Sequence, residues 1–420
     1  MTRPALLAAA IAACAALTPS PGACADDDAA LSIADQATME KEEAGDWRVF
    51  AESAVRESTR RSSGVVSHGG RLSFDARFDK AFAPGLRAVF ADRLDMNRYY
   101  GAAGDGNINT LKEAYVSWQA APDRIADLGR INVRNGVAMG YNPTDYFKAG
   151  ALRSVVSIDP ASLRENRLGS AMVRGQALWD GGSVSGLYSP KLADRPNNGA
   201  YNVDIGATNQ RNRWMVNASQ KVGPLNPQLL LSGGEGQSAQ LGFNLTGLLN
   251  DATVAYVEWS GGRTRPLLSQ ALGRAADSTF RNRVATGVTY TTESNLSLTA
   301  EYDYNGAGLD RDDWNALRRG PLAAYGAYRT FATSVQDPAT RHNVFLYATW
   351  TDAFMKHLDL TAMLRHDAVD ASRLCWLEAR YHWTRVDLAL QAQVNTGNAT
   401  SNFGALADRR VTQVLLRYFF

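Results

Sequence analysis

The C-terminal end of the chain alternates strictly between two kinds of side chain. Val414, Leu416, Tyr418 and Phe420 fall on one face of an extended strand, and the residues between them, such as Arg417, fall on the other. A strand that crosses a membrane within a barrel needs about 9–11 residues and places every second side chain in lipid. The pattern predicts the closing strand of an outer-membrane β-barrel. Phe420 is then the expected contact for the barrel-assembly machinery.

The same period of two recurs along the chain. Around residue 75, Leu72 and Phe74 alternate with Arg71 and Arg77, which fits a strand with one apolar and one polar face. Eighteen such stretches are expected, at 46–57, 69–79, 85–95, 110–119, 126–135, 170–180, 182–189, 212–221, 227–233, 238–247, 251–260, 280–291, 294–304, 341–351, 357–366, 372–383, 385–395 and 410–420. We predict an all-β fold, a closed antiparallel transmembrane β-barrel of about 18 strands, or 16 if one hairpin is miscounted.

The expected connections indicate which face looks outward. A soluble sandwich also alternates, but it turns its apolar face inward. Here short connections, such as 80–85 and 248–250, alternate with long ones, such as 136–169 and 306–341, and this sorting by length is the pattern of outer-membrane barrels. Aromatic residues near strand ends on the apolar face fit the girdles of a membrane interface, namely Trp47, Trp118, Trp214, Trp259, Trp350, Trp383 and Tyr418.

The first 25 residues have the layout of a secretory signal. Arg3 precedes an apolar stretch, and Ala23-Cys24-Ala25 forms a small-residue cleavage site. The alternative is lipoprotein processing at Cys14, which would leave that cysteine acylated. We expect a signal peptide over 1–25, an acidic, disordered periplasmic lead over 26–45, and the barrel over 46–420.

Composition excludes several classes of function. The formal net charge is +2, which implies neither nucleic acid nor an acidic partner. No stretch after Ala25 approaches the roughly 18 consecutive apolar residues of a spanning helix. Cys375 is the only cysteine after Ala25, so no internal disulfide is expected in the exported chain. No H-E-x-x-H, Cys/His zinc spacing or P-loop occurs, and neither a cofactor nor a metal is expected.

The polar phase of the expected strands is rich in arginine. Taken as facing the lumen, the candidate pore-lining residues are Arg48, Arg56, Arg71, Arg77, Arg87, Arg93, Glu113, Arg130, Arg134, Arg174 and Arg213. Basic residues outnumber acidic ones in the first eight strands, whereas later strands are mixed to acidic and include Glu258 and Glu301. Opposed walls of this kind create a transverse field that favours small anions near the basic wall. The alternative is that these charges pair and brace the barrel.

The connection 136–169 combines turn-forming, basic and aromatic residues. A loop of this length often folds into the tube and sets its narrowest point. The candidate constriction residues are Lys148, Arg153, Arg164 and Arg167. An external lid, or a surface that meets lipopolysaccharide, would use basic residues equally well. The connection 306–341 is the second candidate for a constriction.

Two short stretches resemble a known family. Residues 111–116 (Leu-Lys-Glu-Ala-Tyr-Val), a short turn and Leu128-Gly129-Arg130 resemble the hairpin of large outer-membrane porins, and are most similar to the alginate-export-like group. The resemblance implies an eighteen-stranded barrel with an Arg-lined path for anionic polysaccharide, and Arg130 as a lumen arginine. Those families continue with Gln after the Gly-Arg pair, where this chain has Ile131.

Together these features predict a channel in a Gram-negative outer membrane rather than an enzyme. We expect passive passage of polar solutes, with anions and oligo- or polysaccharides favoured, and contact with outer-membrane lipid and lipopolysaccharide. One alternative is an outer-membrane hydrolase, for which His366, His382 and Glu378 form the constellation to examine. The other is a barrel scaffold plugged by a partner protein.

Overall fold

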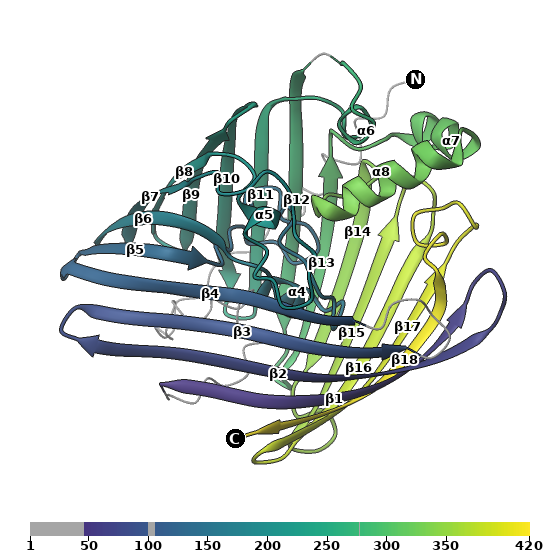
Figure 1. The fold of residues 1–420 in the computed structure, drawn as a ribbon, viewed down its shortest axis with the longest axis horizontal. Helices are drawn as coiled ribbons and strands as arrows, with labels where there is room; N and C mark the ends of the chain where they lie inside the picture. Colours follow the sequence, from purple (N-terminus) through teal and green to yellow (C-terminus); the bar gives the residue numbers. More distant parts are fainter. Residues whose placement is uncertain (1–45, 100–105, 277) are drawn as a thin grey trace.

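The computed structural model describes residues 46–99, 106–276 and 278–420. The signal peptide, the lipoprotein cysteine and the acidic lead predicted for residues 1–45 lie outside these ranges. The described residues form one eighteen-stranded sheet (Figure 1). Its strands are β1 (Trp47–Arg60), β2 (Val66–Ala83), β3 (Leu86–Tyr99), β4 (Gly106–Ala121), β5 (Arg124–Ile131), β6 (Ser170–Trp179), β7 (Gly182–Ser189), β8 (Arg213–Gln220), β9 (Leu225–Gly234), β10 (Gln237–Asn250), β11 (Thr253–Thr264), β12 (Thr279–Thr291), β13 (Leu296–Asn305), β14 (His342–Trp350), β15 (Leu358–Asp367), β16 (Arg373–His382), β17 (Val386–Thr396) and β18 (Asp408–Phe419).

The sheet closes on itself. Each strand pairs with the next one in antiparallel register, and β18 pairs with β1, so that Phe50 faces Phe419 and Val55 faces Val414. Closure leaves no edge strand with unpaired backbone groups. The prediction of a closed antiparallel barrel of 18 strands is confirmed.

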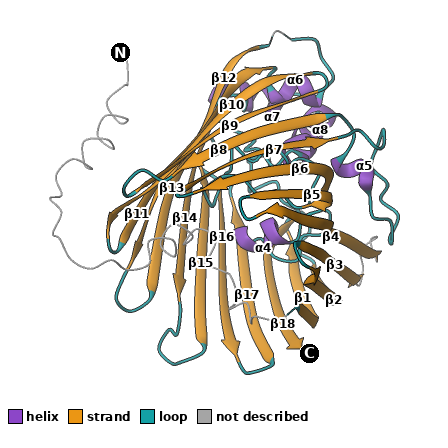
Figure 2. Ribbon diagram, turned by 90° about the vertical axis from the view of Figure 1, so that its left-hand side faces the viewer, coloured by secondary structure: helices purple, strands orange, loops and turns teal. Residues whose placement is uncertain are grey.

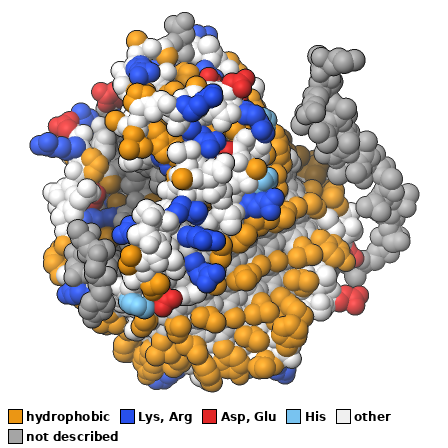
Figure 3. All heavy atoms as spheres, turned by 90° about the vertical axis from the view of Figure 1, so that its right-hand side faces the viewer, with side chains coloured by type: hydrophobic (Ala, Val, Ile, Leu, Met, Phe, Trp, Pro, Cys, Tyr) orange, Lys and Arg blue, Asp and Glu red, His pale blue; other side chains and the backbone are white. Residues whose placement is uncertain are grey.

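The barrel buries its polar phase and exposes its apolar phase. On β1 and β3 the charged side chains of Glu52 and Arg93 are each 2% exposed, whereas Leu72 and Phe74 on β2 are 41% and 44% exposed. The exposed apolar side chains form a broad band on the outside of the barrel (Figure 3). This arrangement is the inverse of a soluble protein, in which charged residues are almost never fully buried.

Short helices occupy the longer connections. They are α4 (Pro160–Glu165), α5 (Ile205–Thr208), α6 (Leu267–Ala271), α7 (Arg311–Arg319) and α8 (Leu322–Ser334). Helices α6, α7 and α8 lie together at one end of the barrel (Figure 1). They pack around Trp314 and Tyr328, which have no exposed surface. In the described part of the chain, no helix combines the length and the apolar character needed to span a membrane.

One expected strand is shorter than its pattern suggests. The alternation over 126–135 predicts a strand that includes Arg134, but β5 ends at Ile131. Its neighbour β6 begins at Ser170, in register with Ile131, so no partner strand continues the ladder beyond that point. The chain turns inward instead, and the Arg167 guanidinium donates to the carbonyl of Val133 at 3.0 Å. The assignment of Arg134 to a strand was wrong.

Candidate functional site

The segment 132–169 turns into the barrel instead of covering its end. Tyr141, Phe147 and Ala151 within it are buried, and α4 lies inside the ring of strands (Figure 2). Asp159, the N-cap residue of α4, accepts a hydrogen bond from the backbone N–H of Ser162 at 3.0 Å and from the Tyr347 hydroxyl of β14 at 2.6 Å. The segment therefore fills part of the interior.

Two carboxylates on the opposite wall hold this segment by its backbone. Glu258 of β11 accepts hydrogen bonds from three backbone N–H groups between residues 137 and 144, at 2.7–3.2 Å. Glu301 of β13 accepts three more from residues 139–141, at 2.8–3.0 Å, and one from the Tyr256 hydroxyl at 2.7 Å. Both carboxylates are buried. Hydrogen bonds to an ionised acceptor are roughly twice as strong as neutral ones, so these carboxylates fix the segment across the barrel.

Two glycines permit this close approach. Gly136 has φ of 95°, and a Cβ there would lie 2.6 Å from both carboxylate oxygens of Glu258. A Cβ at Gly140 would lie 2.6 Å from the Phe345 ring and 2.9 Å from Glu301 Oε1. A side chain at either position would displace the segment from its anchoring carboxylate.

Two of the candidate constriction residues are engaged deep in the segment. Lys148 lies 2.9 Å from the Asp337 carboxylate, and its Nζ lies 4.5 Å from the centre of the Tyr141 ring. Arg167 is 2% exposed and pairs with Asp145 at 2.6 Å. Because Asp337 follows α8, the Lys148 ion pair also ties the infolded segment to the helices at the end of the barrel.

The other two are bound to backbone carbonyls, as is Arg130. The Arg164 guanidinium donates to the carbonyl of Gly136 at 3.2 Å. Arg153 donates to the carbonyls of residues 199 and 202, and Arg130 to those of residues 169, 203 and 204. The last two arginines therefore join the infolded segment to the connection 190–212. Arg130 is buried, so its guanidinium serves this joint rather than open water.

The wall formed by β1 to β3 and β18 contains a buried ion-pair network. Glu52 accepts from Arg71 at 2.6 Å, from Arg93 at 2.9 Å and from Arg417 at 3.0 Å. The guanidiniums of Arg93 and Arg417 also lie 5.9 Å and 4.5 Å from the centre of the Phe50 ring. One carboxylate and one ring thus hold three arginines against the wall.

Most remaining candidate lining residues also have partners. The pairs are Arg48 with Glu165, Arg56 with Asp408, Arg87 with Asp79, Arg174 with Asp127, and Arg213 with the carbonyl of Thr208. The arginines predicted to line the tube therefore lie in the polar phase, but these guanidiniums are engaged with acceptors of the barrel and its connections.

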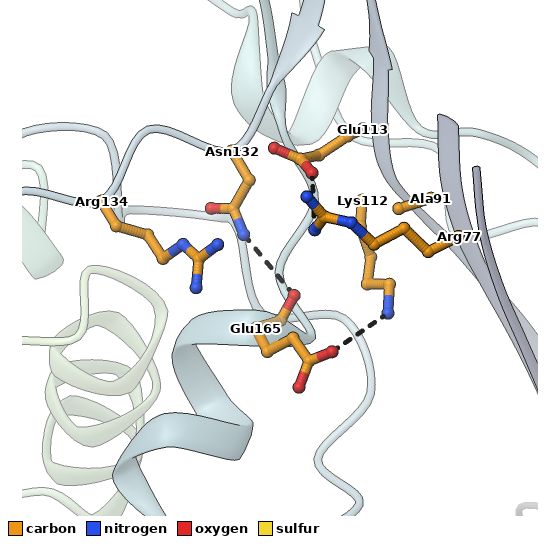
Figure 4. Close-up of a pocket in the computed structure, with 7 residues that line it drawn as sticks. All are labelled: Arg77, Ala91, Lys112, Glu113, Asn132, Arg134 and Glu165. Atoms are coloured by element: carbon orange, nitrogen blue, oxygen red, sulfur yellow. Dashed lines mark hydrogen bonds and ion pairs between the residues drawn. The ribbon is translucent and has the colours of Figure 1, made fainter. Parts of the chain in front are cut away.

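One recess of the interior keeps charged groups accessible. It is lined by Arg77, Ala91, Lys112, Glu113, Asn132, Arg134 and Glu165 (Figure 4). Arg134 is exposed, and no carboxylate among the described residues lies within 4 Å of its guanidinium. Arg77 lies 3.4 Å from both Asp79 and Glu113. Among the described residues, the recess thus presents the Arg134 guanidinium, which has no carboxylate partner, beside the Arg77 guanidinium, which is shared between two carboxylates.

Glu165 closes the recess on the side of α4. Its carboxylate lies 2.6 Å from Arg48 and 3.8 Å from the Lys112 ammonium. Burial opposes its ionisation, but Lys112 and Arg48 outweigh burial and lower the pKa of Glu165 to about 2. The side chain is therefore an anion at neutral pH, and it compensates two of the basic groups nearby.

The histidine constellation considered for a hydrolase is not assembled. His366 is in register with Arg373 at one end of β16, whereas His382 ends the same strand and is in register with Asp387. His382 lies 2.9 Å from the Asp387 carboxylate, and Glu378 pairs with Arg380. Within residues 46–99, 106–276 and 278–420, no group of three or more His, Cys, Asp or Glu side chains could hold a metal ion.

Sequence reasoning missed the anchoring role of Glu258 and Glu301, and it left Lys112, Asn132 and Glu165 out of the site. The alternation placed the two glutamates in the lumen but could not show what they bind. One signal was present in the stretch 136–141, Gly-Val-Ala-Met-Gly-Tyr. It has no charged side chain and two glycines, and such a stretch lets carboxylates approach backbone N–H groups closely.

Comparison with known proteins shows the fold. No family model matches the chain, and no curated protein matches it. Among solved structures it is similar to OccAB1 of Acinetobacter baumannii, with TM-score 0.56, 11% identity, and 91% of this chain and 99% of that chain covered. OpdQ of Pseudomonas aeruginosa gives TM-score 0.55, 9% identity and 90% and 99% coverage. OccAB3 of Acinetobacter baumannii gives TM-score 0.54 and 8% identity, with 89% of this chain and 98% of that chain covered.

These neighbours are outer-membrane porins. At such low identity the likeness shows only that this chain shares their β-barrel fold. It gives no support to the narrower alginate-export-like group.

Proposed function

We propose that this chain is an outer-membrane channel through which small polar solutes diffuse. The observation that carries the proposal is the inverted surface of the closed barrel, which exposes apolar side chains outside and holds charged ones inside. A membrane core requires every backbone polar group to be paired within the protein, and a closed barrel meets this requirement. The porin fold of the structural neighbours supports the same location and role.

Anions are the favoured solutes in this proposal. The acidic wall expected from the sequence presents less negative charge to the lumen, because Glu258 and Glu301 are buried beneath residues 137–144. Arg134 meanwhile stays exposed in the recess. An accessible cation beside a wet path raises the local concentration of anions. Selection would then depend on the recess rather than on the whole series of arginines.

Polysaccharide passage is the finer alternative that the resemblance at 111–116 and 128–130 suggests. These residues do form a hairpin, with Ala114 in register with Arg130 and Val116 with Leu128. Arg130, the one residue carried over, is engaged with carbonyl groups. This engagement favours small solutes over a polymer path lined by free arginines.

The test is reconstitution of the full chain in a planar bilayer with a potassium chloride gradient. We expect stepwise conductance and a reversal potential of the sign that marks chloride preference. Replacing Arg134→Gln should lower the chloride-to-potassium permeability ratio about two- to five-fold, since one charge about 4 Å from an ion is worth on the order of 1 kcal/mol in water. The control is Arg124→Gln, which removes an exposed charge at the start of β5, next to a tight turn.

Three outcomes would separate the alternatives. Potassium preference in the unaltered chain would overturn the anionic part of the proposal. An equal shift in both variants would show that Arg134 has no special role. Absence of current, with correctly folded protein in the bilayer, would favour a plugged scaffold over a channel.

A further inference from the structure

The outward faces of β16 and β18 each run from an aromatic residue to an arginine. On β18 the face leads from Tyr418 through the exposed Leu416 and Val414 to Arg410, and on β16 it leads from Tyr381 to Arg373. Eight residues at about 3.3 Å each span roughly 26 Å along the strand, which at a tilt of about 35–45° is roughly 20 Å along the membrane normal. The apolar band of an outer-membrane barrel is about 25 Å tall. With the aromatic residue at one interface, both arginines therefore lie close to the opposite edge of the apolar band, on the side of the long connections.

Strand register brings these two arginines close together. Arg373 is in register with Thr396 of β17, and Arg410 is in register with Val394 of the same strand. Neighbouring strands are about 4.8 Å apart and the two partners on β17 are two residues apart, so the backbones of the two arginines lie roughly 12 Å apart across β17. Both side chains are exposed, and each is long enough to reach into the space between them.

Arg373 and Arg410 form a basic patch, and its charges are not neutralised within the described residues. No carboxylate there lies within 4 Å of Arg373 or Arg410. Asp408, at the start of β18, is taken by Arg56 at 2.6 Å, and Glu57 on the outer face of β1 lies 3.7 Å from His68. Lys and Arg side chains gather immediately above the apolar band on this side of the molecule (Figure 3). The patch thus combines unpaired guanidiniums with a continuous apolar surface below them.

We propose that Arg373 and Arg410 form a binding site for the phosphate groups of a membrane lipid whose acyl chains lie along β16 to β18. The guanidinium fork matches phosphate oxygens bidentately. The apolar surface of Val394, which lies beside Arg410, and of Leu377 and Val414, which are exposed further toward the middle of the band, would pack against the chains. A phosphorylated glycolipid of the lipopolysaccharide type, with phosphate at the level of the interface, fits both features. This inference rests on the membrane location proposed above.

The experiment measures binding of purified full-length barrel in neutral detergent by native mass spectrometry. The probes are diphosphorylated lipid A, its dephosphorylated form and inorganic phosphate. We expect the double variant Arg373→Gln/Arg410→Gln to bind diphosphorylated lipid A about tenfold more weakly, and to bind the dephosphorylated form as the unaltered chain does. The matched control Arg124→Gln/Arg195→Gln removes two exposed arginines from other places and should leave binding unchanged.

Several results would overturn the proposal. Unaltered affinity of the double variant, or an equal loss for both lipid forms, would show that the arginines do not read the phosphate. Complete displacement of the lipid by millimolar inorganic phosphate would show a site for a free anion instead of a lipid. The variant Arg373→Lys/Arg410→Lys keeps both charges. We expect it to bind diphosphorylated lipid A more tightly than the glutamine double variant does. Because binding is read in detergent, its failure is distinct from absence of conductance in a bilayer.

Discussion

The two sides of the barrel interior use their charges differently. On the wall of β1 to β3, Glu52 is surrounded by three guanidiniums, and the charged groups satisfy one another within the wall. On the wall of β11 to β13, Glu258 and Glu301 bind the backbone of a segment that crosses from β5. The charged groups of the first wall bind one another, whereas those of the second wall bind another part of the chain.

This difference shows that inward-facing charge has two separate structural uses. A carboxylate paired with arginines stabilises the strands that carry it. A carboxylate that accepts backbone N–H groups positions whatever segment supplies them. Only charges left over from both uses, such as that of Arg134, are available to a solute.

The largest expected effect comes from removing the centre of the first wall. Glu52→Ala leaves Arg71, Arg93 and Arg417 without their shared carboxylate, and loss of one partner from a buried ion pair costs about 3–5 kcal/mol. The free energy of unfolding, measured by urea titration in detergent, should fall by that amount. Glu57→Ala, on the exposed face of the same strand, is the matched control. An equal loss of stability in both variants would contradict the difference between the two faces.

Weakening the second wall should alter the pore more than the stability. Glu258→Gln or Glu301→Gln replaces charge-assisted acceptors, each substitution costing about 1.5–3 kcal/mol. The freed backbone groups of residues 137–144 can be hydrated, so we expect noisier and larger single-channel currents. Glu293→Gln, in a tight turn, controls for loss of a carboxylate. Currents identical to those of the unaltered chain would show that this wall does not hold the segment in the path.

The smallest effect concerns pH at the recess. The folded pKa of Glu165 is about 2, below its ordinary value of 4.5. Its negative charge, and the stability that its ion pairs contribute, are therefore fully present above pH 4.5. Both are lost as pH falls toward 2. The difference in chloride preference between Glu165→Gln and the unaltered chain should therefore persist at pH 4, as recorded by reversal potential. Loss of about half of this difference by pH 4.5 would show that Lys112 and Arg48 do not lower the pKa of the carboxyl.

Strand phase was predictable because it is a local property. Leu72 and Phe74 alternate with Arg71 and Ser73 whatever the rest of the chain does, and the same period recurs in every strand. Closure follows from the number of hairpins and from an amphipathic last strand. These features required no knowledge of side-chain contacts.

The site was less predictable because its contacts join distant parts of the chain. Nothing near Glu301 in the sequence indicates that residues 139–141 will donate to it. Arg134 continues an alternating pattern. The strand nevertheless ends at Ile131, because β6 begins at Ser170, which is in register with Ile131, and offers no partner to the residues that follow. Partners for arginines such as Arg130 are carbonyl groups in other connections, and carbonyl groups leave no mark in a sequence.

The central claim is that the apolar face of the strands meets hydrocarbon while the charged face encloses water. Cys375 tests it directly, because it lies exposed on the apolar phase of β16, in register with Leu364 and Val394 and close to the edge of the apolar band that Arg373 marks. The chain, with Cys14→Ala and Cys24→Ala, is labelled at Cys375 with an environment-sensitive fluorophore and reconstituted in vesicles. We predict quenching by brominated acyl chains and protection from aqueous iodide. Quenching by iodide without any effect of brominated lipid would contradict the account.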